Sequence, residues 1–324
     1  MSLGEFELIR RFFSQGGPQR ADVSLGVGDD AALVRVPEGA ELVVAADTIV
    51  AGVHFPPNTA PQDIGYRALA VNLSDMAAMG ATPAWATLAL TLPTVDAAWL
   101  EAFSEGFFAL ARLHEVMLIG GDTTSGPLSV TVQIMGWVPE GTALKRSGAR
   151  IGDLVFVSGE IGDAAAGLAL IEGRASTASA AFRDHLQARF WRPLPRVALG
   201  LALRGVASAA IDISDGLAAD LTHVLDASRV GARLELERLP LSTALAATLG
   251  AQRCVESALA GGDDYELCFT LSPDHEHLLS AVAAEGGCAV TRVGVVEEPP
   301  GLRLYRDGVA APIPVRGYEH FRAG

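Results

Sequence analysis

Six short segments of the 324-residue chain place aspartate beside glycine, serine or threonine, and these residue types suit divalent cations and phosphates. The segments are Gly28-Asp29-Asp30, Asp47-Thr48, Asn72-Leu73-Ser74-Asp75, Gly120-Gly121-Asp122-Thr123-Thr124, Asp212-Ile213-Ser214-Asp215-Gly216 and Gly261-Gly262-Asp263-Asp264. Mg²⁺ prefers hard oxygen ligands and few protein groups per ion, so several ions on one polyphosphate require aspartates from several segments. Neighbouring glycines let the backbone approach the phosphates closely. The combination predicts an enzyme that binds a nucleotide through Mg²⁺ held by aspartates.

Taken singly, each segment also fits an ordinary structural role. Asp-Gly is a common turn sequence. Asp215 is placed to cap a helix that begins at Leu217, and Asp30 is placed to cap a turn. Only the repetition of the pattern along the chain favours a cation site over a series of turns.

Cationic side chains for phosphate binding are scarce. The chain contains no Gly-x4-Gly-Lys-Ser/Thr motif, and Lys145 is its only lysine. A lysine-bearing phosphate loop is therefore excluded, and the positive charge must come from metal ions and arginines. Arg146 is the best-placed arginine because a guanidinium group suits bidentate contact with phosphate. A salt bridge within a linker is the alternative role for Arg146.

Evidence for nucleophilic catalysis is weak, because the chain has no Gly-x-Ser-x-Gly and no cysteine in a nucleophile motif. His54, within Gly52-Val53-His54-Phe55-Pro56, is either a structural histidine or a contact to substrate. Tyr318, within Gly317-Tyr318-Glu319-His320-Phe321, is an aromatic that either stacks on a flat ring or anchors packing.

The composition limits the class of protein. A formal net charge of −14 argues against a nucleic-acid partner, and it suits an enzyme whose aspartates hold cations. Hydrophobic residues make up 50% of the chain, yet no run of about eighteen apolar residues indicates a membrane helix. The three cysteines are widely spaced and lack a CxxC pair, which favours free thiols in the cytoplasm.

Hydrophobic periodicity predicts the elements that position these segments. Strands and helices alternate through the first 140 or so residues, which favours an α/β domain. We expect helices at 63–79, 95–114, 163–171 and 217–228, and strands at 85–92, 116–119, 129–138, 153–158, 209–213 and 264–271. A change in composition near 141–152 predicts a boundary, with domains at 1–145 and 146–324. Residues 174–181 read as a surface loop, and each aspartate segment is expected where a strand or helix meets a loop.

In order along the chain, these segments resemble the thiamine-monophosphate kinases, members of the aminoimidazole ribonucleotide synthetase-like superfamily. The resemblance covers residues 4 to 321. It is carried by Gly4-Glu5-Phe6, Gly26-Val27-Gly28-Asp29-Asp30, Gly52-Val53-His54-Phe55, Asn72-Leu73-Ser74-Asp75-Met76, Ile119-Gly120-Gly121-Asp122-Thr123-Thr124, Asp212-Ile213-Ser214-Asp215-Gly216-Leu217, Gly261-Gly262-Asp263-Asp264-Tyr265-Glu266-Leu267 and Gly317-Tyr318-Glu319-His320-Phe321.

The resemblance implies direct transfer of the γ-phosphoryl group of ATP to thiamine monophosphate, giving thiamine diphosphate without a phosphoenzyme. It implies an α/β (α+β) fold of two domains, with the first domain binding ATP and Mg²⁺ and pairing its sheet in a homodimer. The implied site residues fall into four groups: several Mg²⁺ ions on Asp30, Asp47, Asp75, Asp122, Asp212 and Asp215; ATP on Gly121, Asp122, Arg146 and Ser214; the acceptor on His54, Asp263 and Tyr318; and catalytic roles for Asp122, Arg146 and Asp215.

Two positions depart from the family pattern. The family usually has hydroxyl residues before Asp47, where this chain has Ala45 and Ala46, so only backbone carbonyls are available there. The family usually has glutamate where this chain has Asp263, a carboxylate with shorter reach. Two alternatives stay open: another ATP-dependent enzyme of the superfamily, similar to aminoimidazole ribonucleotide synthetase, and a non-catalytic nucleotide or metal sensor.

Overall fold

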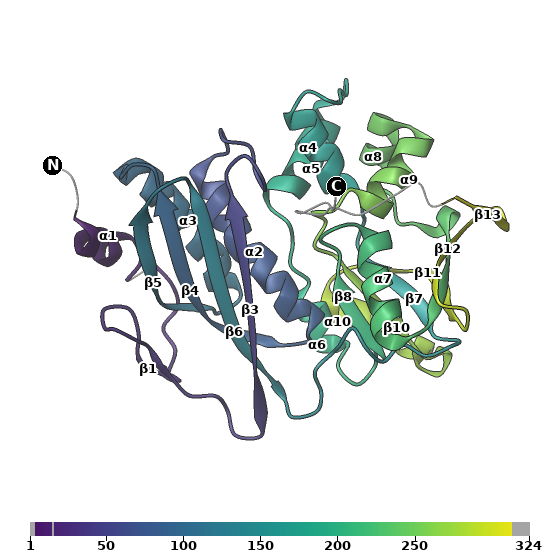
Figure 1. The fold of residues 1–324 in the computed structure, drawn as a ribbon, viewed down its shortest axis with the longest axis horizontal. Coiled ribbons are helices and arrows are strands. Elements are labelled where there is room, and N and C mark those ends of the chain that lie inside the picture. Colours follow the sequence, from purple (N-terminus) through teal and green to yellow (C-terminus); the bar gives the residue numbers. More distant parts are fainter. Residues whose placement is uncertain (1–3, 15, 313–324) are drawn as a thin grey trace. The chain divides into compact units, whose positions relative to one another are not determined.

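The computed structural model describes residues 4–14 and 16–312. The chain divides into two compact units, each with its own sheet and helices (Figure 1). Unit 1 comprises Met1–Met76 and Ala81–Gly141, and unit 2 comprises Ala77–Gly80 and Thr142–Gly324. The functional domains proposed at 1–145 and 146–324 stay a prediction. No helix in the described part of the chain is both long enough and apolar enough to span a bilayer.

Unit 1 is built on a four-stranded sheet in the order β3-β6-β4-β5. Only the pair β4 and β5 is parallel, and the other neighbours are antiparallel. Its elements are α1 (Glu5–Phe12), β1 (Val23–Leu25), β2 (Leu33–Val34), β3 (Ala40–Val50), α2 (Pro61–Ala78), β4 (Thr82–Leu92), α3 (Ala97–Leu113), β5 (Met117–Ser125) and β6 (Ser129–Pro139).

Helices α2 and α3 cover one face of this sheet (Figure 1). In α2 the apolar residues Leu69, Leu73 and Met76 recur at helical spacing, and all are fully buried. Helix α3 begins at Asp96, whose carboxylate accepts the backbone N–H of Ala98 at 2.9 Å and so caps the first turn. The sequence therefore forms both helices for local reasons, and burial of their apolar faces against the sheet holds them there.

The opposite face of the sheet is only partly covered. The ribbon of β1 and β2 packs over one end of it, where Trp85 lies in a cluster with Val23 and Val34. Asp22 ties this ribbon down, since it pairs with Arg20 at 2.8 Å and accepts the Trp85 indole N–H at 3.2 Å. This attachment fixes the start of the chain segment that carries Gly28-Asp29-Asp30.

Unit 2 is built on a seven-stranded sheet in the order β13-β12-β9-β11-β7-β10-β8. All neighbours are antiparallel except β9 and β12. Its elements are β7 (Leu154–Ser158), α4 (Asp163–Ile171), α5 (Ala180–Trp191), α6 (Val197–Ala202), β8 (Ala209–Asp212), α7 (Leu217–Ser228), β9 (Gly231–Glu235), η1 (Leu236–Arg238), α8 (Thr243–Leu249), α9 (Ala251–Ala260), β10 (Leu267–Leu271), η2 (Pro273–Leu278), α10 (Leu279–Gly286), β11 (Val290–Glu297), β12 (Gly301–Arg306) and β13 (Val309–Ala311).

Strands β7, β8 and β10 of unit 2 each have an end at the same side of the sheet. Strand β8 ends at Asp212, β7 ends at Ser158, and the antiparallel β10 begins opposite them, with Leu267 paired to Asp212. Helices α4 and α7 both begin just after those strand ends. The N–H groups at their N-termini therefore gather near this end, where they favour anionic groups.

The predicted mixture of helices and sheets in two domains is confirmed, and five local predictions are wrong. Asp47 and Asp122 lie inside β3 and β5, and Asp75 lies inside α2, so these residues do not mark the ends of elements. Strands β3 and β5 extend through their aspartates because β6 and β4 pair with them there. Helix α5 begins inside the expected loop at 174–181, and β10 begins at Leu267 because residues 264–266 bond to other parts of unit 2.

Candidate functional site

A cavity of about 460 Å³ in unit 1 brings together Asp30, Gly121 and Asp122. Its other lining residues are Ile9, Phe13, Val27, Gly28, Asp29, Leu88, Leu118, Gly120 and Thr123. The carboxylate of Asp29 accepts the backbone N–H of Asp30 at 2.8 Å and so shapes the turn. The turn at Asp30 and strand β5 form the acidic part of the cavity wall. Helix α1, Leu88 and Leu118 form the apolar part.

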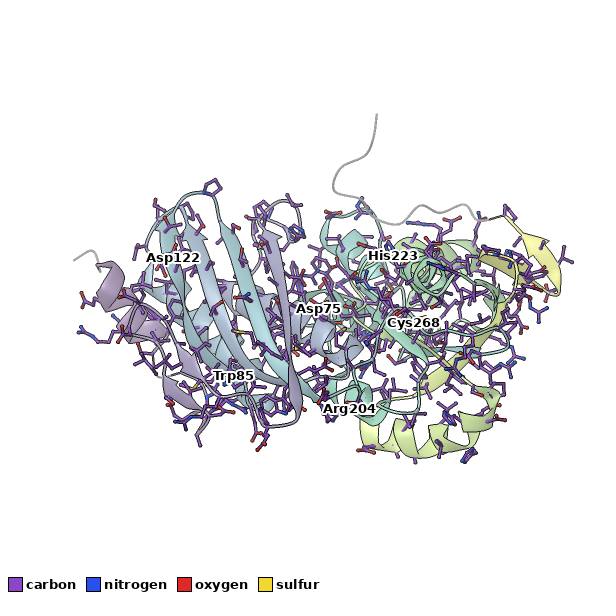
Figure 2. All side chains as sticks on the ribbon, turned by 60° about the horizontal axis from the view of Figure 1, so that its bottom comes forward. Asp75, Trp85, Asp122, Arg204, His223 and Cys268 are labelled. Atoms are coloured by element: carbon purple, nitrogen blue, oxygen red, sulfur yellow. The ribbon has the colours of Figure 1, made fainter. Side chains whose placement is uncertain are left out.

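Gly121 allows β5 to pass this cavity. Its φ is +152°, and a Cβ atom at this position would lie 1.9 Å from the carbonyl oxygen of Leu88. Any side chain would therefore break the pairing of β5 with β4, and only glycine fits. The next residue, Asp122, pairs with Ala89, and Figure 2 shows Asp122 and Trp85 at opposite ends of this sheet. Asp122 is thus held at the end of the sheet away from the β1–β2 ribbon.

A second acidic group lies between β3 and α2. The side-chain carbonyl of Asn72 accepts the backbone N–H of Asp47 at 3.1 Å, and Asn72 donates to the Ala68 carbonyl at 2.9 Å. Asp75 is three residues after Asn72, so it lies on the same face of α2. Burial raises the pKa of Asp47, so a nearby positive charge would favour its ionised form.

The strand register separates this second group from the cavity. Asp47 pairs with the buried Val132, whereas Asp122 lies in the next row, beside Ala89 and Thr131. Because successive side chains of a strand alternate, Asp47 and Asp122 point to opposite faces of the sheet. The structure therefore brings Asp30 and Asp122 to one cavity and places Asp47 beside Asn72, one helical turn before Asp75, as two separate groups within unit 1.

His54 has a defined tautomer. The backbone N–H of Val50 donates to His54 Nδ1 at 3.0 Å, so Nδ1 carries no proton. In the neutral ring the proton is then on Nε2, which is a donor. The neutral His54 ring therefore has an Nε2–H group, which is a donor type that suits an oxygen of a phosphate.

The third acidic group lies in unit 2 at the end of β8. Asp212 and Asp215 lie close to Asp220 of α7, whose carboxylate accepts the Asp215 N–H at 3.0 Å. Burial is the largest of the effects that raise the pKa of Asp220 to about 8, and the charges of Asp212 and Asp215 act in the same direction. Three carboxylates around one loop form an arrangement that a cation would stabilise.

Asp220 is a site residue that sequence reasoning missed, and Asn72, which lay in a predicted segment, was given no role of its own. An acidic residue in the first turn of a helix is ordinarily assigned to the helix dipole, so Asp220 gave no distinct signal. The structure also excludes the capping role considered for Asp215, because Gly216 is the N-cap residue of α7 and no side chain caps this helix.

The segment Gly261–Glu266 lies directly against the Asp212–Gly216 loop. The N–H of Asp263 donates to the Ser214 carbonyl at 2.8 Å, and the N–H of Tyr265 donates to the Ile213 carbonyl at 2.8 Å. The Tyr265 hydroxyl contacts the Asp263 carboxylate at 3.3 Å. Ser214, Asp215 and Asp263 are therefore neighbours in unit 2, although about fifty residues of chain separate them.

Arg146 lies beside β8, the strand that ends at Asp212. The preceding residue, Lys145, accepts the Ala210 N–H of β8 at 3.0 Å, and Ser228 donates to the Arg146 carbonyl at 3.2 Å. The Arg146 side chain is exposed, and it forms no ion pair with any residue that the structure describes. This contradicts a linker salt bridge within the described chain and leaves the guanidinium accessible to an anion. Tyr318 lies outside the described residues.

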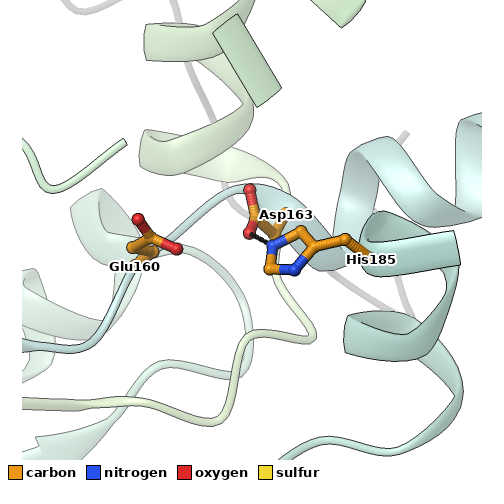
Figure 3. A group of neighbouring side chains, drawn as sticks. All are labelled: Glu160, Asp163 and His185. Carbon is orange, nitrogen blue, oxygen red and sulfur yellow. Dashed lines mark hydrogen bonds and ion pairs between the residues drawn. The ribbon is translucent and has the colours of Figure 1, made fainter. Parts of the chain in front are cut away.

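A fourth group, Glu160, Asp163 and His185, holds one ligand-type atom each within 4.8 Å of the others (Figure 3). The Asp163 side chain is fully buried, and both of its oxygens already have partners: the Ser242 hydroxyl at 2.6 Å and His185 Nε2 at 2.8 Å. These bonds join α4 to α5 and to the start of α8. We therefore assign Asp163 to the scaffold of unit 2.

Comparison with known proteins gives the class to which this fold and site belong. The family model of the AIR synthase related protein N-terminal domain matches residues 28–138. The family model of the AIR synthase related protein C-terminal domain matches residues 150–307.

The relatives are more specific. Thiamine-monophosphate kinase of Escherichia coli K12 is 49% identical over 322 residues, which is 99% of each chain. The crystal structure of thiamine-monophosphate kinase from Stenotrophomonas maltophilia is 50% identical, with a TM-score of 0.87 over 96% of this chain and 99% of that one. A solved complex, AaThiL with AMPPCP and TMP, is 32% identical, with a TM-score of 0.77 over 92% of this chain and 93% of that one. The chain belongs to the AIR synthase related proteins and, within them, to the thiamine-monophosphate kinase family.

Proposed function

We propose that this chain transfers the γ-phosphoryl group of ATP to the phosphate of thiamine monophosphate and so forms thiamine diphosphate. The observation that carries the proposal is the unit 1 cavity, in which carboxylates adjoin an apolar wall. A flat purine base suits the apolar wall of Phe13 and Leu118, and a cation-bound triphosphate suits Asp30 and Asp122. The named substrate of the relatives, and the AMPPCP and TMP of the AaThiL complex, support this donor and this acceptor.

The reaction requires little covalent chemistry from the protein. A phosphate monoester is already ionised near neutral pH, so an oxygen of the acceptor can attack the γ-phosphorus in line without a strong general base. Catalysis then consists of positioning and of stabilising the charge on the transferred group. The absence of a recognisable nucleophile motif agrees with direct transfer.

The side chains of both units fit Mg²⁺, because each acidic group offers hard carboxylate oxygens. We assign the ions to Asp30, Asp47, Asp75 and Asp122 of unit 1 and to Asp212 and Asp215 of unit 2. When bound, Mg²⁺ neutralises charge on the phosphates. Burial of Asp47 disfavours its carboxylate ion, and burial and the nearby Asp212 charge disfavour that of Asp220, so a bound cation would favour both ions.

The remaining contacts follow from donor and acceptor chemistry. Gly121 N–H, the exposed Arg146 and the Ser214 hydroxyl are assigned to ATP, and His54 Nε2–H to an oxygen of the acceptor phosphate. The carboxylate of Asp263 suits the cationic thiazolium part of the acceptor. Catalytic roles fall to Asp122, Arg146 and Asp215, which hold the transferred group and its cations.

This chain has Ala45 and Ala46 where the family usually has hydroxyl residues, so β3 has fewer side-chain oxygens that could bind a cation. The two residues pair with β6, opposite Ile134 and Gln133, and because β3 is an edge strand only one of their two carbonyls faces β6. Neither residue has a side-chain oxygen, so we assign the side-chain cation ligand of this strand to Asp47 alone.

We also propose that unit 1 forms a homodimer through its sheet. Leu42 and Val44 on the edge strand β3 are 50% and 49% exposed and lie in alternate positions on one face. An edge strand with exposed apolar side chains invites pairing with a second copy. The homodimer implied by the family resemblance agrees with this assignment.

The test is a product assay. The purified chain is incubated with ATP, MgCl₂ and thiamine monophosphate, and thiamine diphosphate is measured by chromatography. We expect stoichiometric formation of thiamine diphosphate and ADP, with no covalent phosphoryl-protein in rapid-quench samples. A chain that binds ATP and thiamine monophosphate but forms no thiamine diphosphate would be a sensor, and the proposal would fail.

A further inference from the structure

The segment Gly261–Glu266 and the Asp212–Gly216 loop are joined by consecutive backbone bonds. Besides the bonds of Asp263 and Tyr265 already described, the N–H of Ile213 donates to the Glu266 carbonyl at 2.8 Å. Ladder pairing continues directly from there, with Leu267 opposite Asp212. The two loops therefore cannot shift separately without breaking several hydrogen bonds.

This joined arrangement is conformationally strained. Gly262 has a φ of +69°, and a Cβ atom there would lie 2.5 Å from the Ser214 carbonyl oxygen, so the close approach requires glycine. Asp263 and Tyr265 have φ values of 64° and 51°, in the left-handed region that residues with side chains rarely adopt. Such conformations persist only where the surroundings over-determine them.

Glu266 supplies that surrounding structure. Its side chain has no solvent exposure, and its two oxygens accept four hydrogen bonds. Arg196 donates two of these in a bidentate arrangement, at 2.6 and 2.5 Å. Arg189 donates at 2.7 Å and the Ser158 hydroxyl at 2.6 Å. A carboxylate offers about four acceptor sites, so every site of Glu266 is filled and its orientation is fixed.

A second bond set fixes the middle of the segment. The Asp264 carboxylate accepts the N–H groups of Gly162 and Ala164 at 2.7 and 3.3 Å, at the start of α4. The segment is thus fastened on both sides of Tyr265. Asp263, between these fastenings and the Asp212–Gly216 loop, is the side chain that we assign to the acceptor.

Stability alone is a weak explanation for this arrangement. Buried ion pairs pay a desolvation penalty that often equals their attraction, and apolar residues can replace them without loss of stability. The geometry of Arg196 is directional, however, since a guanidinium fork matches a carboxylate in one plane. The directional pair of Arg196 and Glu266 therefore suits a role in holding the strained segment in one conformation.

We propose that Glu266, held by Arg196 and Arg189, is a positioning residue that fixes Asp263 relative to the cation-binding Asp212–Asp215 loop. This inference rests on the proposed function, because Asp263 and that loop take their roles from it. Loosening the anchor lets both loops relax together. The affinity for the acceptor and the affinity for Mg²⁺ must then fall together, although Glu266 contacts neither.

The test compares the full-length wild type with Arg196→Lys, which keeps the positive charge and loses the fork. We expect the KM for thiamine monophosphate and the half-saturating Mg²⁺ concentration each to rise about tenfold, as for other residues that support metal ligands. The Mg²⁺ concentration that gives half of the Mg²⁺-induced rise in Tm should increase by a similar factor. This last readout does not depend on turnover.

Arg303→Lys is the matched control. Arg303 also pairs with a glutamate of unit 2, through Nε to Glu297 at 3.2 Å, but on β12, away from both loops. Neither constant should change in this variant. Arg189→Lys is the second test variant, because Arg189 gives Glu266 one bond and Arg196 gives it two. It should shift both constants in the same direction by a smaller factor, and it decides the question if Arg196→Lys fails to fold.

A lower Tm or a smaller active fraction with both constants unchanged would make the anchor merely structural and would overturn the inference. A change in only one constant would also overturn it, because the two loops would then move independently. If the wild type forms no thiamine diphosphate, the proposed function fails, and the Mg²⁺-dependent Tm of the variants still decides whether Glu266 positions the cation loop.

Discussion

Asp264 gives a quantitative prediction about stability and pH. Its side chain is 1% exposed, and burial raises its pKa from 3.8 to about 8, against the opposing effects of the Gly162 N–H and of Arg189. One pKa unit corresponds to about 1.4 kcal/mol, so the full shift corresponds to about 6 kcal/mol as an upper bound. The folded state therefore binds a proton at Asp264 over a pH range in which the unfolded chain has lost it.

The sign of the effect follows from linkage. Because the folded pKa is raised, the contribution to stability is fully present below about pH 4 and is lost as the pH rises through about 8. Asp264→Asn removes this dependence, since asparagine does not titrate. We expect the difference in unfolding free energy to shift in favour of the variant by about 2 to 4 kcal/mol between about pH 5 and 8.5, because about three pH units of this range lie below the folded pKa.

Urea unfolding of both proteins, without Mg²⁺ and at several pH values, measures this shift. Taking the difference between wild type and variant cancels the groups that titrate in both. Asp184→Asn serves as the control, because it makes the same charge change at an exposed position of α5. A difference that stays constant across this pH range would refute the reasoning, and Asp264 would then be ionised throughout, balanced by Arg189 and by the start of α4.

Three further predictions concern the site and its supports. Asp122→Asn and Asp75→Asn should each lower kcat/KM at least about a hundredfold while the circular dichroism spectrum stays unchanged, because each removes a proposed cation ligand; wild-type turnover in both would contradict the assignment. Leu42→Arg should yield monomers in size-exclusion chromatography with light scattering, because it charges the exposed face of β3; an unchanged wild-type dimer would place the interface elsewhere. Asp22→Asn should destabilise the chain by about 1 to 3 kcal/mol in urea unfolding, because it weakens the pair with Arg20 that holds the ribbon over Trp85; an unchanged midpoint would show that the ribbon is held by its apolar contacts alone.

The local spacing of apolar residues predicts many of the helices and strands of this fold. The apolar spacing of residues 63–79 and 95–114 indicates helices, and α2 and α3 occupy nearly those ranges. Alternation in residues 129–138 indicates a strand, and β6 forms there. The pattern fails for α5, where only Leu186 and Phe190 are buried and the other apolar residues are interspersed with polar ones. A helix with so narrow an apolar face differs little in sequence from a surface loop.

The parts of the site that sequence could not predict depend on non-local partners. The position of Asp122 inside β5 follows from pairing with β4, and nothing near Asp122 announces that pairing. Glu266 meets Arg189 and Arg196 across 77 and 70 residues of chain. Burial of a charged side chain is unfavourable by itself, so no local rule predicts a buried glutamate until its partners are known.

In this chain, which has one lysine and a net charge of −14, the proposed polyphosphate site carries negative charge before the nucleotide binds. Lysine-based sites hold positive charge before the nucleotide arrives, and this chain instead holds buried and crowded carboxylates. Burial raises the pKa of Asp47, and burial together with neighbouring carboxylates raises that of Asp220, so both negative charges are unfavourable without a cation. Phosphate alone would add to the repulsion, whereas phosphate carrying Mg²⁺ removes it. The proposed Mg²⁺ assignment therefore predicts that the acidic groups favour the metal-bound nucleotide over the free nucleotide, and that the same unfavourable charge lowers the stability of the protein without cations.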